Sequence, residues 1–459
     1  MRPGTLKISA SIVLAILIVG SLPFVGLTER PVDDRQGVVI DFGYWDASWT
    51  DMSFSEGQDA LDALEAACER EGYSEPVYLP DGSVYSVNGQ TNLPNASWNL
   101  FLLRGSGWEM FDDPSAVDIA GEDIVCWARS SDAGNIVPCT DASGHTFYSY
   151  AREGESLVTG KAMRVVSLAP SVTEVLCSVG CLTNIVGTDG YSDHPDDIVD
   201  ARDDGSVVSV GGYIDPNYER IIGLAPDLVF CDGSVGEQVS MADRLRKSGI
   251  GCVILYDCKD IASVYDNIWI VASAMGFSDR ANSTISGTMS SISVTSGIVG
   301  DTGKRVFVSL SADPSPWTSG SDTYLSDVIS ASGGTNVFDT QSSSWFMVSK
   351  EQVYAKQPDV IVIILENRPI GSQEEYTALL ESLDPVWRNT PAYRNGEVYV
   401  FTGSSADVLS RYGPRVSEAV ELMSKILDPS AFTDRDPMDI IPKYFGDDYG
   451  DYLRYQEVS

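Results

Sequence analysis

Side chains able to do catalytic chemistry are scarce in this 459-residue chain, and their spacing matches no known catalytic arrangement. The only two histidines, His145 and His194, are too few and too far apart for a catalytic triad or a metal cluster. The sequence contains no G-x-S-x-G, Walker A, G-x-G-x-x-G or H-E-x-x-H motif. The missing motifs therefore disfavour an enzyme with a resident metal or cofactor and leave binding of a ligand or partner as the alternative.

Aromatic residues in polar loops are the best candidates for that binding. Trp317 and Trp345 stand in the segments WTSGS and SSSWF, whose serines and glycines favour loops over buried core. Tyr191 and Tyr213 follow glycines in GYSDHP and GGYIDP, and for these two tyrosines packing in the core is an equally open alternative. Rigid aromatic faces bury broad apolar ligands well.

Eight cysteines allow disulfides if the chain is exported, but their irregular spacing leaves the pairing open. With two histidines beside them, a zinc site is not expected. Cys177, Cys231 and Cys252 lie in apolar surroundings, so we expect buried free thiols there.

The elements that must position these residues form an α/β pattern from Arg164 onward. Short apolar runs typical of parallel strands are Arg164–Leu168, Asp227–Cys231, Cys252–Tyr256, Arg305–Leu310, Val360–Leu365 and Val398–Phe401. Ser171 and Glu174 are spaced like a helix capping box after the first run. Residues 260–297 lack a strand pattern and have helical periodicity, which predicts two α/β lobes, about 163–258 and 303–430, bridged by one long helix.

The chain before and after these lobes differs in character. Residues 38–150 read as a small β-rich α+β domain, with strands expected at Ser83–Val87, Trp98–Leu103 and Asp123–Ala128. A polar linker is expected at 152–162. The acidic, aromatic tail (431–459) either packs on the second lobe or stays mobile.

The first thirty residues resemble a targeting segment. Arg2 and Lys7 precede an apolar stretch from Ile8 to Leu27, long enough to cross a bilayer once. Because it is long for a cleaved signal, we favour an uncleaved transmembrane anchor over cleavage. A lipid-modified N-terminal cysteine is not expected, since the first cysteine is Cys68. Residues beyond about 28 are thus expected outside the cytoplasm.

The net charge of −36 limits the partners of such an exported protein. A strongly acidic surface repels nucleic acid and anionic lipid headgroups, so neither is an expected partner. Acidic surfaces also simply aid solubility.

Several segments together resemble one family. RVVSLAPSVTEVLCSVG, IVGTDGYSDHP, VGGYIDPNYERIIGLAPDLVF, WTSGSDTYLSDVISASGGTNVF and SSSWFMVSKEQVYAKQPDVIVI follow each other over residues 163–430. This pattern is similar to the periplasmic binding proteins of ABC importers for vitamin B12, ferric siderophores and haem, and among these to the vitamin B12 type. The resemblance implies two Rossmann-like lobes, one bridging helix and a ligand held in the cleft between the lobes.

Residue by residue, the resemblance implies two sets of functional side chains. Tyr191, Tyr213, Trp317 and Trp345 match aromatics that line the cleft, which indicates a corrinoid ligand. Glu219 in N-Y-E-R-I and Glu351 in S-K-E-Q-V match carboxylates that dock on arginines of the permease, one on each lobe. Tyr213 departs from the vitamin B12 pattern, where a Trp is familiar, and His194 in this loop introduces a group able to reach a metal.

The domain at 38–150 resembles the C-terminal domain of transcobalamin and intrinsic factor. The segments that carry this likeness are GQDALDALEAACEREG, SVYSVNGQTN, SWNLFLLRGSGWEMF and IAGEDIVCWA. The resulting hypothesis is a corrinoid-binding protein that feeds an ABC permease. The alternatives are a ferric siderophore or haem carrier of the same family, or a surface adhesion or scaffold protein that has lost its ligand.

Overall fold

The computed structural model describes residues 36–42, 47–92, 96–104, 107–111, 113–120, 124–131, 146–150, 154–158, 162–255, 258–275, 277–366, 368–432 and 441–456. The expected targeting segment (1–30) and His145 lie outside these ranges. No helix within them is long and apolar enough to cross a membrane.

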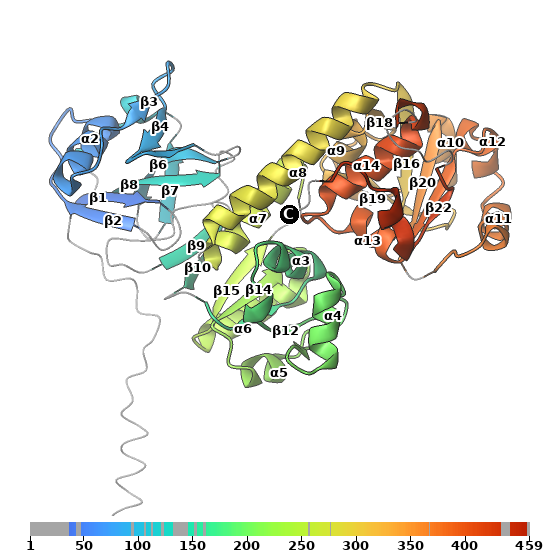
Figure 1. Cartoon of the computed structure of the whole chain (residues 1–459), viewed down its shortest axis with the longest axis horizontal. Helices are drawn as coiled ribbons and strands as arrows, with labels where there is room; N and C mark the ends of the chain where they lie inside the picture. The colour runs from blue at the N-terminus through green and yellow to red at the C-terminus, as the bar shows by residue number, and fades with distance from the viewer. Residues whose placement is uncertain are drawn as a thin grey trace, which may run out of the picture. The chain divides into compact units, whose positions relative to one another are not determined.

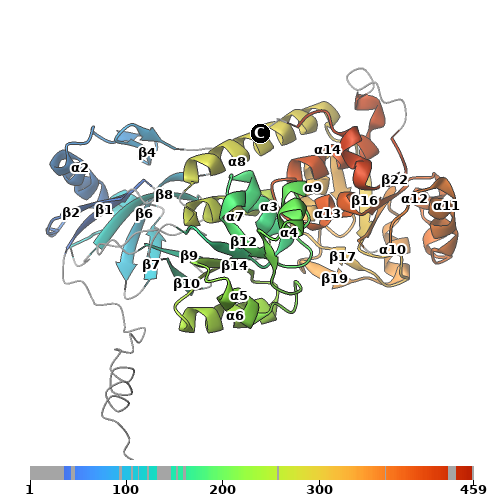
Figure 2. The same ribbon diagram turned by 60° about the horizontal axis from the view of Figure 1, so that its bottom comes forward.

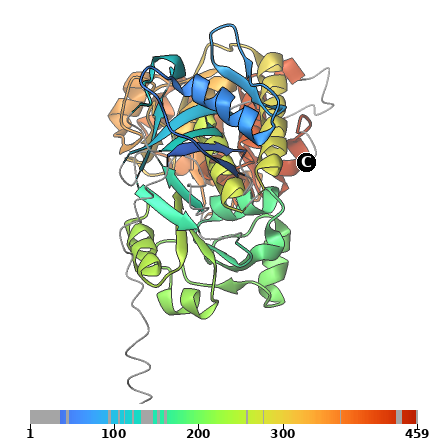
Figure 3. The same ribbon diagram turned by 90° about the vertical axis from the view of Figure 1, so that its left-hand side faces the viewer.

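The N-terminal domain is a mixed sheet covered by one helix. Its strands are β1 (Gly37–Asp41), β2 (Ala47–Asp51), β6 (Ala96–Arg104), β7 (Gly107–Phe111) and β8 (Ile124–Ser131). They run in the order β2-β1-β8-β6-β7, and only the β1–β8 pair is parallel. Helix α2 (Ala60–Glu71) lies against this sheet (Figure 3) and begins where the Asp59 carboxylate accepts hydrogen bonds from the Leu61 and Asp62 amides. Ala60, Leu64 and Ala67 join Trp127 in a separate apolar core.

Two smaller strand groups lie outside this sheet. One is the three-stranded sheet of β3 (Val77–Tyr78), β4 (Val84–Val87) and β5 (Gln90–Thr91). The other is the antiparallel pair of β9 (Thr146–Tyr150) and β10 (Gly154–Val158), and β10 contacts the strand Gly251–Leu255 of the first lobe. The expected linker at 152–162 therefore contains a strand. The segment GESLV has a polar composition, but it pairs along its whole length with the aromatic TFYSY of β9, and cross-strand pairing overrides composition.

The first lobe is an all-parallel α/β unit (Figure 1). Its strands β11 (Val165–Ser167), β12 (Ile185–Thr188), β13 (Val208–Ser209), β14 (Leu228–Asp232) and β15 (Gly251–Leu255) run in the order β13-β12-β11-β14-β15. Its helices are α3 (Pro170–Ser178), α4 (Asp196–Asp203), α5 (Tyr218–Gly223) and α6 (Gly236–Lys247). Because both faces are covered, β14 is buried at every residue.

The second lobe repeats the plan. Strands β16 (Lys304–Ser309), β18 (Gly334–Asn336), β20 (Val360–Leu365), β21 (Val398–Thr402) and β22 (Tyr444–Phe445) form a parallel sheet in the order β18-β16-β20-β21-β22. Its helices are α9 (Tyr324–Ala331), α10 (Lys350–Lys356), α11 (Gln373–Ser382), α12 (Pro391–Arg394), α13 (Ser404–Ser410) and α14 (Val416–Leu427). The expected α/β class with parallel sheets is confirmed.

Where the sequence predicts one helix over about 260–297, the chain forms two. These are α7 (Ile261–Ala274) and α8 (Ser278–Val299). The Phe277 amide donates to the Ala272 carbonyl and closes the last turn of α7, and the sequence has a glycine, a common helix terminator, at position 276. Helix α8 is therefore the connecting helix, and it packs on both α7 and α14 (Figure 1).

The C-terminal tail packs on the second lobe over its described part. Phe445 of β22 is buried, and its ring stacks on Phe401 of β21. The Glu421 carboxylate on α14 accepts hydrogen bonds from the Arg454 and Tyr455 amides. The tail thus adds β22 as an edge strand of the sheet and binds α14 through Glu421. The composition of the tail alone does not predict this packing.

Candidate functional site

Two loops of the first lobe carry exposed apolar side chains beyond the carboxyl ends of their strands. Tyr191 follows β12 and is 63% exposed, and Ile214 follows β13 and is 66% exposed. The Gly190 amide donates to the Gly211 carbonyl at 2.8 Å, which joins the two loops. A Cβ atom at Gly212 would come within 3.8 Å of the Tyr191 ring. Carboxyl ends of parallel strands are where ligands bind in α/β sheets.

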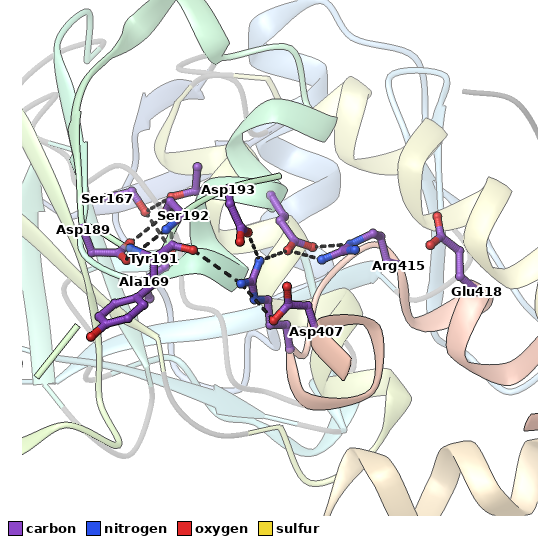
Figure 4. A network of polar contacts seen from close by, with 12 residues as sticks. Ser167, Ala169, Asp189, Tyr191, Ser192, Asp193, Asp407, Arg415 and Glu418 are labelled. Atoms are coloured by element: carbon purple, nitrogen blue, oxygen red, sulfur yellow. Dashed lines mark hydrogen bonds and ion pairs between the residues drawn. The ribbon is translucent and has the colours of Figure 1, made fainter. Parts of the chain in front are cut away.

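Asp189 fixes the loop that carries Tyr191. Its carboxylate is fully buried and accepts hydrogen bonds from the Tyr191 and Ser192 amides at 2.7 and 3.1 Å and from the Ser192 hydroxyl at 2.5 Å (Figure 4). Burial raises the pKa of Asp189, and the three hydrogen bonds partly offset this effect. Tyr191 is thereby presented on a rigid turn, which lowers the entropy lost on ligand binding.

Asp232, the last residue of β14, links the lobes through two tyrosines. Its Oδ2 accepts a hydrogen bond from the Tyr213 hydroxyl of the first lobe at 2.8 Å and from the Tyr412 hydroxyl of the second lobe at 2.6 Å. The Ser234 amide and hydroxyl donate to Oδ1 at 2.8 and 2.6 Å. Tyr213 is half-buried and packs on the main core, so its hydroxyl is engaged while part of its ring stays accessible.

A two-stranded ribbon presents the second set of aromatics. It consists of β17 (Trp317–Ser319) and β19 (Trp345–Met347), which pair antiparallel as a sheet of their own, with β17 beside β16 (Figure 2). Trp317 pairs with Met347 across the ribbon, and Ser319 pairs with Trp345, so these four residues share one face. The other face carries Phe346, which packs into the core of the second lobe.

The face of the ribbon opposite Phe346 is apolar and accessible at Trp317 and Met347, whereas Ser319 on the same face is fully buried. Trp317 is 50% exposed and Met347 is 59% exposed. Trp345 is half-buried and packs against the main core. Exposed large apolar side chains gathered on one face mark binding surfaces more often than stability elements.

A cluster of charged side chains joins the lobes beside these loops (Figure 4). Arg415 of the second lobe donates from Nη2 and Nε to both carboxylate oxygens of Glu174 on α3, at 2.5 and 2.9 Å. Arg411 contacts Glu174 at 3.1 Å, Asp193 at 2.7 Å and Asp407 at 3.0 Å. Glu174 and Arg415 are both buried, so removing either partner would leave an uncompensated charge.

This cluster corrects the interpretation of Glu174 as part of a capping box. Helix α3 begins at Pro170 after Ala169, and no side chain caps it. Glu174 lies in the first turns of the helix with its carboxylate directed to arginines of the other lobe. An interlobe partner some 240 residues away in sequence cannot be read from local spacing.

The two carboxylates expected to dock on a permease are both solvent-exposed. Glu219 lies in the first turn of α5 and Glu351 in the first turn of α10. Helix α10 begins with a capping box in which Ser349 and Gln352 exchange hydrogen bonds. Glu219 and Glu351 thus each lie exposed at a helix start, one in each lobe, as do other glutamates in the first turns of α6 and α11.

Neither a metal site nor disulfides emerge around this region. Within the described ranges no group of three His, Cys, Asp or Glu side chains is arranged to hold a metal ion. His194 lines a cavity with Glu174 and Arg415, and burial lowers the pKa of its imidazole. Cys177, Cys231 and Cys252 are free thiols.

The structure brings the predicted residues together in pairs. Tyr191 and Tyr213 share adjoining loops in the first lobe, and Trp317 and Trp345 share the ribbon of the second lobe. Sequence reasoning missed Ile214, Met347, Asp232, Tyr412 and the arginine pair. A signal existed for Asp232, because it ends the apolar run LVFCD, where polar residues of parallel strands meet a ligand.

The comparisons with known proteins concern the two-lobed part of the chain. A family model described as "Periplasmic binding protein" matches residues 165–404, just over half of the chain. The chain belongs to the periplasmic binding protein family and is a substrate-binding protein of the ABC-transporter type.

Named relatives fall within the same class. The chain is 25% identical over 274 residues to an uncharacterized ABC transporter substrate-binding lipoprotein, YvrC, of Bacillus subtilis, which covers 59% of this chain and 81% of that protein. It is 29% identical over 218 residues to the vitamin B12-binding protein of Salmonella typhimurium, covering 47% and 77% of the two chains. The corresponding protein of Yersinia pestis is 30% identical over 203 residues, covering 44% and 69%.

Solved structures share the fold. A periplasmic binding protein from Veillonella parvula has a TM-score of 0.53 at 18% identity and covers 61% of this chain and 97% of its own. A possible iron-binding periplasmic protein from Staphylococcus epidermidis has a TM-score of 0.51 at 24% identity and covers 59% and 100%.

Proposed function

We propose that this chain is the extracytoplasmic binding protein of an ABC importer and that its ligand is a corrinoid. The observation that carries this proposal is the gathering of exposed apolar side chains on both lobes. Tyr191 and Ile214 supply them in the first lobe, and Trp317, Trp345 and Met347 supply them in the second. A corrin is a broad, largely apolar ring fringed by neutral amides, and such faces bury it well.

The charges near these side chains favour a neutral ligand over an anionic one. Arg411, whose Nη2 reaches the Tyr191 carbonyl at 3.4 Å, is already engaged by Glu174, Asp193 and Asp407. An anionic siderophore or the propionates of haem would compete with three carboxylates for this cation. The similarity to proteins named as vitamin B12-binding supports the same ligand class.

Delivery follows from the exposed carboxylates. We infer that Glu219 and Glu351 pair with cations of the permease, one on each lobe, which would fix the register of docking. The contacts that Glu174 and Asp232 make between the lobes limit lobe motion in the isolated protein. Release of the ligand would therefore require the permease to break these contacts.

The proposal also assigns roles to the segment before residue 31 and to the N-terminal domain. The segment before residue 31 would anchor the protein to the membrane or direct its export. The N-terminal domain would act as a second corrinoid contact or a lid, in line with its resemblance to the domain that covers corrinoids in transcobalamin. Its role as a spacer or a partner-recognition module is the competing outcome.

A comparison of ligands tests the ligand class. The protein is incubated separately with cobalamin, cobinamide, haem and a ferric siderophore, then freed of unbound ligand. A retained corrinoid absorption spectrum, together with calorimetric heat for cobalamin or cobinamide, is expected. Clear siderophore or haem binding with no heat from either corrinoid would overturn the assignment while leaving the transporter class intact.

A further inference from the structure

A polar cavity lies where both lobes meet the connecting helix. It has a volume of about 490 Å³, within the roughly 300–1,000 Å³ typical of small-molecule sites. Its walls come from α3, from the loop at His194, from the α8 face that carries Thr284 and Thr288, from the start of α14 and from Gln456 of the tail. We call it the hinge cavity. None of the aromatics proposed to bind the corrinoid lines it.

Three hydroxyls in the wall of the hinge cavity can act as hydrogen-bond acceptors, beside the donors Arg415 and Gln456, which are engaged within the protein. The Thr288 hydroxyl donates to the Thr284 carbonyl at 2.9 Å, and the Thr284 hydroxyl donates to the Ser178 carbonyl at 3.4 Å. The Ser178 hydroxyl donates to the Val175 carbonyl at 2.8 Å. Each hydroxyl hydrogen is thereby used on the backbone, so oxygen lone pairs remain for an occupant.

The cavity also holds a carboxylate, Glu418, that the positive charge of Arg415 influences but that forms no ion pair among the described residues. Glu418 accepts a hydrogen bond from the Tyr449 hydroxyl at 2.8 Å, and no lysine, arginine or histidine in the described part of the chain forms an ion pair with it. Arg415 is committed to Glu174 and Tyr449. Burial raises the pKa of Glu418 and so disfavours its charged form in the empty cavity, while the Tyr449 hydrogen bond and the Arg415 charge partly offset this effect; a bound cation would favour the carboxylate further. Burial lowers the pKa of His194.

We propose that the hinge cavity binds a small primary-ammonium compound, with Glu418 as the counter-charge and the hydroxyl oxygens of α3 and α8 as further acceptors. An ammonium carries three donors and no acceptor, which matches this wall. A charge-assisted bond to a partly desolvated carboxylate is stronger than a neutral one. An organic cation suits the site better than a bare metal ion, because no three ligating side chains converge among the described residues.

An occupant would contact both lobes and the connecting helix at once. The lining residues Cys177, Thr284 and Ser417 belong to α3, α8 and α14 respectively. Anything that binds this arrangement in preference to a separated one stabilises it. An occupant of the hinge cavity would therefore act as a second ligand that holds the lobes in their present positions.

Calorimetry of the full chain with putrescine tests the proposal, and 1,4-butanediol serves as a neutral ligand of the same length. About 0.3 M NaCl suppresses non-specific attraction to the acidic surface. Putrescine is expected to bind at least tenfold more tightly than the diol. Glu418→Gln should weaken putrescine binding at least tenfold, whereas Glu237→Gln, an exposed carboxylate on α6, should leave it unchanged.

A second variant tests the proposal independently, in case Glu418→Gln does not fold. Thr284→Phe places a bulky ring into the cavity from the partly exposed side of α8 and should also abolish putrescine binding. Circular dichroism melting and corrinoid affinity report whether each variant is folded. Absence of putrescine binding to the native chain, equal binding of the diol, or unchanged affinity in both variants would overturn the proposal.

Discussion

Trp345 lies at the junction between the exposed ribbon and the core, and its indole is the aromatic best placed to anchor a ligand. If it stacks on a corrin, Trp345→Ala should weaken corrinoid binding by roughly 1–3 kcal/mol, the usual loss for a desolvated aromatic anchor. The more exposed Trp317→Ala should cost less. Titration calorimetry with cobalamin measures both, and equal affinity of Trp345→Ala and the native protein would exclude the indole from the site.

Asp407 gives the protein a pH dependence whose sign can be worked out. Burial raises its pKa to about 6 in the folded protein, against about 3.9 in an unfolded chain. Between pH ~4 and ~6 the folded state therefore binds more protons, so the free energy of unfolding falls as pH rises through this window. The loss from this group is on the order of 3 kcal/mol at most, because partial exposure of Asp407 to solvent reduces it.

Asp407→Asn removes that titration. Its free energy of unfolding, measured by denaturant titration from pH 4 to 7, should change less with pH than that of the native protein. The exposed Asp243→Asn on α6 serves as a control and should keep the native slope. Identical slopes in all three proteins would show that Asp407 does not titrate in this range.

The short helices α5 and α10 each place one exposed carboxylate in their first turn, and handover should depend on both. Glu219→Ala and Glu351→Ala are expected to leave corrinoid affinity nearly unchanged and to reduce stimulation of the transporter ATPase. Glu237→Ala and Glu374→Ala alter exposed glutamates in the first turns of α6 and α11 and are matched controls. A tenfold loss of corrinoid affinity with normal ATPase stimulation would contradict the docking assignment.

The C-terminal tail acts as a structural element of the second lobe. Ending the chain at residue 432 removes β22 and with it the Phe401–Phe445 stack and the hydrogen bonds to Glu421. Glu421 and Lys425 would then remain as a buried pair with fewer partners. The truncated chain should lose several kelvin of melting temperature by circular dichroism, and an unchanged melting temperature would show that the tail merely rests on the surface.

Across the whole molecule, the open question is what the N-terminal domain adds to the two lobes. Covalent linkage makes any contact between this domain and a bound corrinoid effectively intramolecular, so even a weak second site slows release. The dissociation rate of corrinoid should be lower for residues 31–459 than for residues 160–459. Equal dissociation rates, with no corrinoid binding by the isolated domain, would contradict a second corrinoid contact and support a role as a spacer.

Some features of this protein are determined by local sequence. Continuous apolar runs such as VIVIIL can only be buried on both faces, so the parallel sheets follow from composition and spacing. Aromatics among serines and glycines are partly exposed, as at Trp317, because the polar neighbours leave one side of the ring in solvent, although Phe346 of SSSWF still packs on the core. The family resemblance is likewise carried by contiguous segments of the chain.

Other features depend on contacts between distant residues. Whether GESLV is linker or strand depends on its pairing with β9, and whether the acidic tail packs depends on the free edge of β21. Glu174 meets Arg415, and Asp232 meets Tyr412, only because the two lobes lie against each other. The hinge cavity has the same origin, since its walls come from five separate segments whose apposition no local pattern encodes.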